Sequence, residues 1–285
     1  MTVKHEMPEK ELAVPNDGFF SPDMMIWQVD REMALLLAGG RALLMQLAHP
    51  KVAAGVAQHS RFKEDPLGRL HRTMTTMWSI VFDETALARA ALERVQNVHR
   101  KVQGTIPAAE PLAAGTPYDA LDMELLLWVH ATLIDSALAA YDLFVKPLAA
   151  DEKSRYYDDS KKLARLFEIP ATFVPGSLVE FNRYLDRMLG GDEIAVGPAA
   201  RALADEILYP RPWILRPAGP LFRLITAGLL PEKLQRGYAL GWNERKEKTF
   251  RLIAKSLRSL RPLVPGSLRI VANARAAERR RLRRP

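Results

Sequence analysis

Cysteine is absent from this chain of 285 residues. Without cysteine the protein can have no disulfide, no thiolate-ligated haem, no iron–sulfur cluster and no zinc site that uses cysteine. Long apolar runs are also scarce. The most apolar stretch, residues 33–48, is interrupted by Arg41 and two glycines and falls short of the ~20 residues that span a membrane. No secretory signal is visible at the N-terminus, so we expect a cytoplasmic protein.

Common catalytic motifs are missing as well. The chain contains no GxGxxG, Walker A, HExxH or GxSxG sequence, which are the motifs of dinucleotide binding, nucleotide hydrolysis, zinc proteolysis and serine hydrolysis. It also contains no Glu-x-x-His, whereas the di-iron sites of helical bundles need this motif on two helices. These absences count against a ferritin-like oxygenase.

What remains is a pattern of apolar residues at helical spacing, in a chain that is 48% hydrophobic. No alternating strand pattern and no internal repeat interrupts it. We therefore predict an all-α fold of about ten helices in a single domain at residues 19–262. Residues 1–18 form a flexible lead-in, and residues 263–285 form a basic tail. The most apolar helix, Met123–Phe144, is predicted to be central, with Asp122 as its N-cap.

Proline and glycine divide the rest of the chain. Pro50 and Pro66 are predicted to start helices, with Asp65 as the N-cap of the second. Residues 104–121 and 209–220 are Pro-rich connections. The other predicted helices are residues 22–36, 41–49, 50–58, 66–81, 84–103, 151–168, 178–189, 198–209, 231–242 and 244–258.

The net charge of +8 is concentrated near the C-terminus. One interpretation is a patch for nucleic acid or for an acidic membrane; the other, which we favour, is a solvated tail. No recognition helix, zinc finger or row of stacking aromatics accompanies the charge, so no nucleic-acid partner is expected. Peripheral contact with an acidic membrane through the tail stays open. The cations concerned are Arg251, Lys255, Arg258, Arg261, Arg269, Arg275, Arg279, Arg280, Arg281, Arg283 and Arg284.

Two of the six histidines, His99 and His130, fall in the middle of apolar helical stripes. A histidine in such a place needs a polar partner or a metal. A hydrogen-bonded core histidine is one possibility. The other is a haem ligand, because a haem site needs a flat apolar slot, one neutral imidazole on the iron and cations near the propionates.

Several segments carry a resemblance to a known family. They are GGRALLMQLAHP, AGVAQHSRF, DPLGRLHRT, VHRKVQGT and YDALDMELLLWVHATLIDS, with a weaker one in TAGLLPEKLQRGYALGW. Together they cover roughly residues 20–245, and the chain resembles the oxygenase MpaB family, whose relatives include the rubber oxygenases (latex-clearing proteins). The resemblance implies an all-helical protein that binds haem b (Fe) through a histidine and uses O₂ to oxidise a small hydrophobic substrate.

The same resemblance implies roles for five residues. His99 matches the iron-binding histidine better than His130, which would then line the pocket or bond a propionate. Arg69 would hold a propionate or polarise bound oxygen, and Thr73 would donate a hydrogen bond to bound O₂. Arg41 is a second propionate candidate. The structural alternatives are an Arg69–carboxylate pair, a Thr73 bond to its own helix and a surface position for Arg41.

Two positions depart from the rubber-oxygenase pattern. Arg72 stands where those enzymes have a lysine that can occupy the sixth iron position, and arginine stays protonated. Residues 50–58 contain no carboxylate in place of their proposed glutamate base. Cleavage of polyisoprene is therefore not expected. The predicted function is a haem b-dependent oxygenase; the alternatives are a non-catalytic haem carrier or sensor, and a basic helical protein that docks on acidic membranes or partners.

Overall fold

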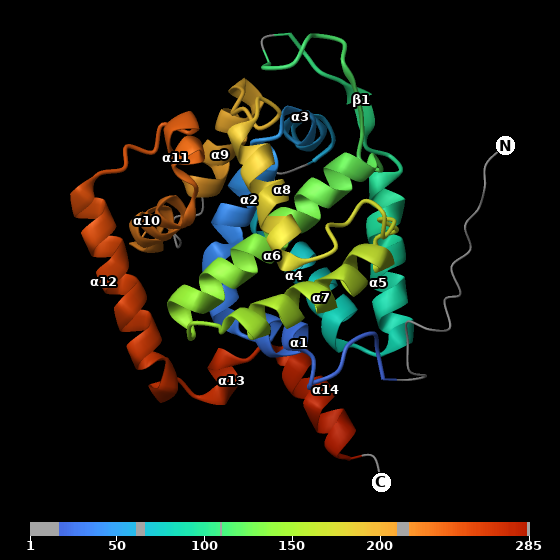
Figure 1. Ribbon diagram of the computed structural model, residues 1–285, viewed down its shortest axis with the longest axis vertical. Coiled ribbons are helices and arrows are strands. Elements are labelled where there is room, and N and C mark those ends of the chain that lie inside the picture. The colour runs from blue at the N-terminus through green and yellow to red at the C-terminus, as the bar shows by residue number, and fades with distance from the viewer. Residues whose placement is uncertain (1–16, 61–65, 109, 210–216, 284–285) are drawn as a thin grey trace, which may run out of the picture.

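The computed structural model describes residues 17–60, 66–108, 110–209 and 217–283. This part of the chain is built from helices around one apolar core, as predicted, with a single two-stranded hairpin (Figure 1). In chain order the elements are α1 (Met25–Asp30), η2 (Met33–Ala38), α2 (Gly39–Leu47), α3 (Pro50–His59), α4 (Pro66–Phe82), α5 (Thr85–His99), β1 (Gln103–Thr105), β2 (Pro117–Asp119), α6 (Met123–Phe144), α7 (Ala150–Leu166), α8 (Leu178–Gly190), α9 (Pro198–Leu208), α10 (Gly219–Leu229), α11 (Glu232–Gly237), α12 (Glu244–Leu260), η4 (Arg261–Leu263), α13 (Gly266–Arg269) and α14 (Ala272–Leu282).

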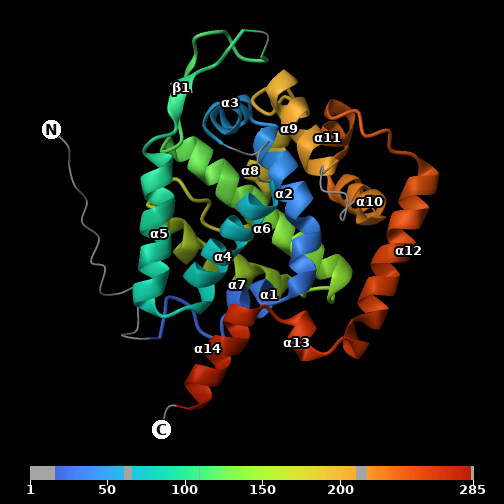
Figure 2. The same cartoon turned by 180° about the vertical axis from the view of Figure 1, so that it is seen from behind.

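Helix α6 is central, which confirms the prediction for the most apolar segment. The Asp122 carboxylate accepts a hydrogen bond from the Glu124 backbone N–H at 3.0 Å and so caps the helix. By length and composition alone α6 could cross a membrane, but most of its apolar stretch is buried inside the protein. It packs against η2, α2, α7 and α12, and both views show it running through the middle of the molecule (Figures 1 and 2).

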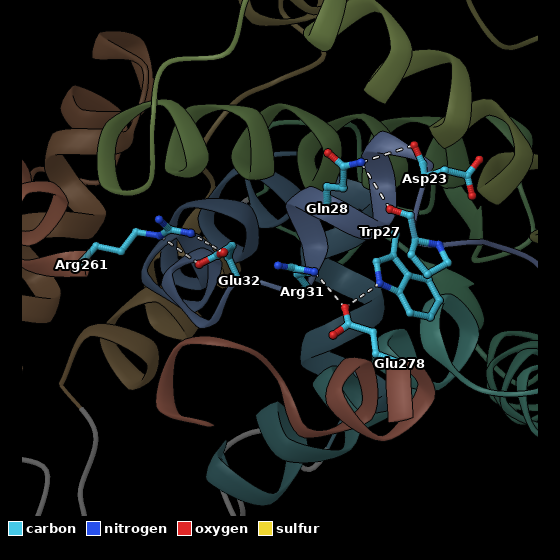
Figure 3. A network of polar contacts seen from close by, with 8 residues as sticks. Asp23, Trp27, Gln28, Arg31, Glu32, Arg261 and Glu278 are labelled. Atoms are coloured by element: carbon cyan, nitrogen blue, oxygen red, sulfur yellow. Dashed lines mark hydrogen bonds and ion pairs between the residues drawn. The ribbon is translucent and has the colours of Figure 1, made fainter. Parts of the chain in front are cut away.

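The single helix predicted over residues 22–36 is wrong, because the chain breaks at Glu32. Helix α1 ends at Asp30, Glu32 has extended backbone angles, and the short 3₁₀ helix η2 follows. The Glu32 side chain is buried and is bound by Arg261 through two hydrogen bonds of 2.6 and 3.2 Å (Figure 3). A buried carboxylate needs such a partner, and the break turns Glu32 toward it.

Pro50 and Pro66 start α3 and α4 as predicted, whereas the Asp65 cap lies outside the described residues. Helix α5 ends at His99, earlier than predicted, because β1 and β2 form an antiparallel hairpin in which Gly104 pairs with Tyr118. The sequence analysis predicted no strand here. Three-residue strands are too short to show an alternating pattern, so the sequence does not predict this hairpin.

Helix α10 is a second correction, since no helix was predicted over residues 219–229. It starts with a Gly-Pro pair, and Ile225 and Leu229 bury their side chains beside Phe250 of α12. Helix α11 is shorter than predicted and ends at Gly237. In both places the Pro- and Gly-rich sequence gives no clear signal of where the helix begins or ends, because tertiary packing sets these boundaries.

The prediction of a solvated C-terminal tail is wrong for residues 272–282, which form α14. Ala274 and Ala277 are buried, and α14 packs on α4. Glu278 accepts hydrogen bonds from Trp27 Nε1 at 3.2 Å and from Arg31 at 2.9 Å (Figure 3). Arg281 donates to backbone carbonyls near the start of the described chain, at 2.7 and 3.0 Å, and lies over the Trp27 ring.

Candidate functional site

The antiparallel pair α4–α5 brings three of the predicted site residues to one end of the molecule. Only residues 83–84 separate the two helices, which pack along their length. The short link directs the first turns of α4 and the last turns of α5 toward the same end of the helix pair. Arg69 and Thr73 lie in the first turns of α4, and His99 is the last residue of α5. The Thr73 side chain is exposed; the side-chain roles predicted for Arg69 lie outside the described residues.

His99 is half-buried. Burial lowers the pKa of its imidazole below the ordinary value, so the ring is neutral at neutral pH. No hydrogen bond joins this imidazole to another described side chain. The Val102 carbonyl accepts a hydrogen bond from the Ala120 N–H at 2.9 Å, which holds the end of α5 beside the start of α6. His99 therefore offers a neutral nitrogen at a junction of helices.

His130, on α6, is only 5% exposed. Burial lowers its pKa to about 4, and its Nε2 atom has no hydrogen-bond partner among the described residues. A buried polar atom without a partner costs about 1–3 kcal/mol, so such an atom is uncommon in a purely structural role. An orphaned nitrogen on a neutral imidazole fits either a metal ion or a polar group of a bound cofactor.

Arg41 is buried at 5% exposure, which excludes the surface position considered above. Its Nε donates to the Leu229 carbonyl at 2.7 Å and its Nη1 to Ser136 Oγ at 2.6 Å. Its Nη2 forms an ion pair with Asp135. These contacts tie α2 to α6 and α10. The role of Arg41 as a propionate ligand stays a prediction.

The β1–β2 hairpin is fixed to the C-terminal end of α3, next to the α4–α5 end. Gln58 accepts a hydrogen bond from the Tyr118 hydroxyl at 2.8 Å and donates to the Thr105 carbonyl at 3.1 Å. The exposed His59 ring lies 3.1 Å from the Gln103 carbonyl. The end of α3 and the hairpin therefore form one region, which adjoins the end of α5.

A pocket of about 800 Å³ opens near the start of α6, and sequence reasoning did not find it. Leu127, one turn before His130 on α6, is in its wall. The other lining residues come from the junction of α2 and α3, the connection between β1 and β2, the start of α6, the loop before α8, α8 itself and the residues after it, so no local motif reveals them. The lining is His49, Lys51, Leu112, Glu124, Leu127, Thr172, Phe173, Val174, Pro175, Gly176, Glu180, Tyr184, Arg187, Met188 and Glu193.

His49 gives this pocket a buried titratable group. Burial, together with the nearby Lys51 charge, lowers the pKa of His49 from 6.5 to about 4. Its Nδ1 accepts a hydrogen bond from the Lys51 N–H at 3.3 Å and caps α3. The acceptor role requires Nδ1 to be unprotonated, so the cap and the low pKa support each other.

We expect His49 to make the protein less stable in acid. Between pH 6.5 and 4 the unfolded chain takes up a proton at His49 that the folded protein does not, so the free energy of unfolding falls as pH falls through this window. His49→Asn keeps a side-chain oxygen for the cap and removes the titration. The wild type should lose about 3 kcal/mol more than this variant between pH 6.5 and 4, measured by urea denaturation.

The comparison with His49→Asn cancels the titration of other groups, such as Asp30, whose pKa burial raises to about 7. Parallel stability curves for the two proteins would contradict the expectation.

Fold and site together define the class: an all-α protein whose central helix α6 carries a buried, neutral histidine, His130. No group of three His, Asp or Glu side chains placed to hold a metal ion occurs within the described ranges. The chain belongs to the family described as ER-bound oxygenase mpaB/B′/rubber oxygenase, catalytic domain, whose model matches residues 27–259. This confirms the resemblance and identifies an oxygenase-type domain.

Two curated proteins are similar to this chain. Uncharacterized protein Mb2261 of Mycobacterium bovis and Uncharacterized protein Rv2237 of Mycobacterium tuberculosis are each 29% identical to it over 231 residues. Each alignment covers 78% of this chain and 87% of the relative. No solved structure matches. The family match ends before α13 and α14, so the C-terminal helices lie outside the matched part.

Proposed function

We propose that this protein is a haem b-dependent oxygenase that acts on a small hydrophobic substrate. Membership in an oxygenase family supports the reaction class. The observation that supports the proposal is the short link between α4 and α5, since the antiparallel order of the two helices would bring His99 toward the end that carries Arg69 and Thr73. That end is where the resemblance puts the ligand and the residues that contact O₂.

The residues present fit a haem. His99 would provide the nitrogen that binds the iron, because its lowered pKa leaves a lone pair free at neutral pH. His130 would direct its unpaired Nε2 toward the same group, as a pocket residue or a propionate partner. Arg69 would place a permanent positive charge near a propionate or near the oxygen site. When bound, the haem would supply the activation of O₂.

The pocket at the start of α6 supports the hydrophobic substrate. About half of its lining residues are apolar or aromatic, including Leu112, Leu127, Phe173 and Met188, and such side chains provide the apolar contacts that a small hydrophobic molecule needs. Leu127 is one turn from His130 on α6. We therefore propose this pocket as the route by which a small apolar molecule reaches the buried histidines.

An absorption spectrum tests the proposal. The full chain, expressed with added haem precursor, should show a Soret band and about one haem b per chain by pyridine haemochrome and iron assay. Oxygen uptake with a panel of small apolar alkenes and aromatic compounds should then exceed that of the protein alone. A colourless, iron-free protein would contradict the proposal. Haem binding without oxygen uptake on any substrate would favour the carrier or sensor instead.

A further inference from the structure

Exposed leucines gather where α12 turns into α13. We call residues 257–268 the α12–α13 corner. Within the described part of the chain, five of thirteen exposed large hydrophobic residues lie in these twelve positions. Leu263 is 78% exposed, Leu268 68% and Leu260 55%. Single exposed leucines are ordinary, but a concentration of them marks an interaction surface.

The corner is held in place rather than loosely attached. Phe250 and Ala254 bury the inner face of α12 against the protein. Arg261, at the start of the turn, is fixed by its ion pair with the buried Glu32 (Figure 3). Pro262 and Pro265 restrict the backbone on both sides of Leu263. The leucines therefore cannot fold back onto the core without breaking these contacts.

Positive charge surrounds the corner. No Asp or Glu occurs between Glu247 and Glu278, whereas seven Lys or Arg residues do. Some are used within the protein: Arg251 pairs with Glu247 and Arg261 with Glu32. Lys255 and Arg258, on the last turns of α12, have no acidic partner among the described residues. The leucines thus lie next to cations that are available to an anionic partner.

We propose that the α12–α13 corner docks on an anionic lipid bilayer. Its leucines would enter the boundary between headgroups and acyl chains, and Lys255 and Arg258 would lie among the lipid phosphates. The shape favours a bilayer: in both views the corner lies at the rim of the molecule, beyond the main group of helices (Figures 1 and 2). A projecting apolar turn with a basic border matches a flat, fluid, negatively charged surface.

This surface differs from the terminal arginines considered from sequence. Arg280 lies 3.7 Å from Asp83, and Arg281 is bonded to backbone carbonyls and lies over Trp27. Those two arginines stabilise α14 on α1 and α4. The leucines that suit a membrane belong to the corner, and the unpaired cations Lys255 and Arg258 lie on the last turns of α12 that lead into it.

Vesicle sedimentation of the full chain tests the proposal. The wild type should bind vesicles of mixed phosphatidylcholine and phosphatidylglycerol far better than vesicles of phosphatidylcholine alone, and added salt should weaken binding. The double variant Leu263→Asp/Leu268→Asp should bind at least about tenfold more weakly. Lys255→Glu/Arg258→Glu should lose binding in the same way while all leucines remain.

The matched control is Leu87→Asp/Val179→Asp, which changes two exposed side chains on α5 and α8, 55% and 59% exposed, by the same chemistry. It should bind as the wild type does, and thermal melts should show that all three double variants are folded. Equal binding by the corner variant and the control would overturn the proposal. So would no binding by the wild type, or a dimer in analytical ultracentrifugation that the corner variant alone abolishes.

Discussion

Replacement of His99 by alanine is expected to abolish the Soret band of the haem-loaded protein. Loss of a residue that only orients a metal ligand costs about 10–100-fold in affinity, so loss of the axial ligand should cost at least about 100-fold in haem affinity. His99 is half-buried at the last position of α5, and the fold should tolerate the change. Haem titration followed by absorbance, with a thermal melt of the haem-free protein, measures both effects.

Two other histidines make the experiment specific. His59 is exposed and contacts only the hairpin in the described structure, so His59→Ala should bind haem as the wild type does. His130→Ala removes a buried side chain with an unpaired nitrogen and should weaken haem binding less than His99→Ala. The reverse order would move the axial ligand to His130. Unchanged spectra in both variants would contradict the proposed site.

Replacement of Arg41 by methionine is expected to lower the free energy of unfolding by about 3 kcal/mol. Methionine fills similar space but leaves Asp135, Ser136 and the Leu229 carbonyl without their shared donor. Removal of one partner of a buried ion pair typically costs 3–5 kcal/mol. The lower end applies because the Asp135 side chain is 28% exposed and water can solvate it. Urea denaturation of the haem-free protein measures the loss.

The same variant tests the propionate role predicted for Arg41. A structural role requires that Arg41→Met destabilise the haem-free protein, and that Arg41→Lys recover only part of the loss, because lysine lacks the planar fork. A propionate role would instead lower haem affinity and leave the haem-free stability unchanged. The two results separate the two roles in one set of measurements.

The parts of the fold that follow from local sequence were predictable. Pro50 and Pro66 fix the first turns of their helices, and Asp122 carries its capping oxygen within reach of the next N–H groups. Helix α6 was evident from its length and apolar content. Each of these features depends on neighbours a few residues away, and tertiary contacts only reinforce them.

The helix break at Glu32 and the unpredicted helix α10 depend on partners that are distant in the sequence. Glu32 ends the first helical segment because of Arg261, 229 residues away. Helix α10 is stabilised because its apolar side packs against Phe250. The sequence of the helix does not predict this contact. A periodic pattern shows that a face will be buried, but not which element buries it.

The site residues also divide into those that local sequence predicts and those that distant contacts determine. The burial of His130 followed from its place on an apolar stripe, whereas the contact of His99 and Arg69 with one cofactor stays a prediction. The partners of Arg41 are 94, 95 and 188 residues away, so its hydrogen bonds could not be foreseen. The pocket around His49 draws its lining from several separate segments, and only the folded chain assembles them.

The contacts between α1 and the C-terminal helix α14 have a consequence during synthesis. Trp27 and Arg31 contact Glu278, which is 251 and 247 residues later. At ~5–20 residues per second, a ribosome needs roughly 12–50 seconds to make the intervening segment. During that interval Trp27 and Arg31 of the nascent chain lack their Glu278 partner, and the final fold can be reached only after translation is nearly finished.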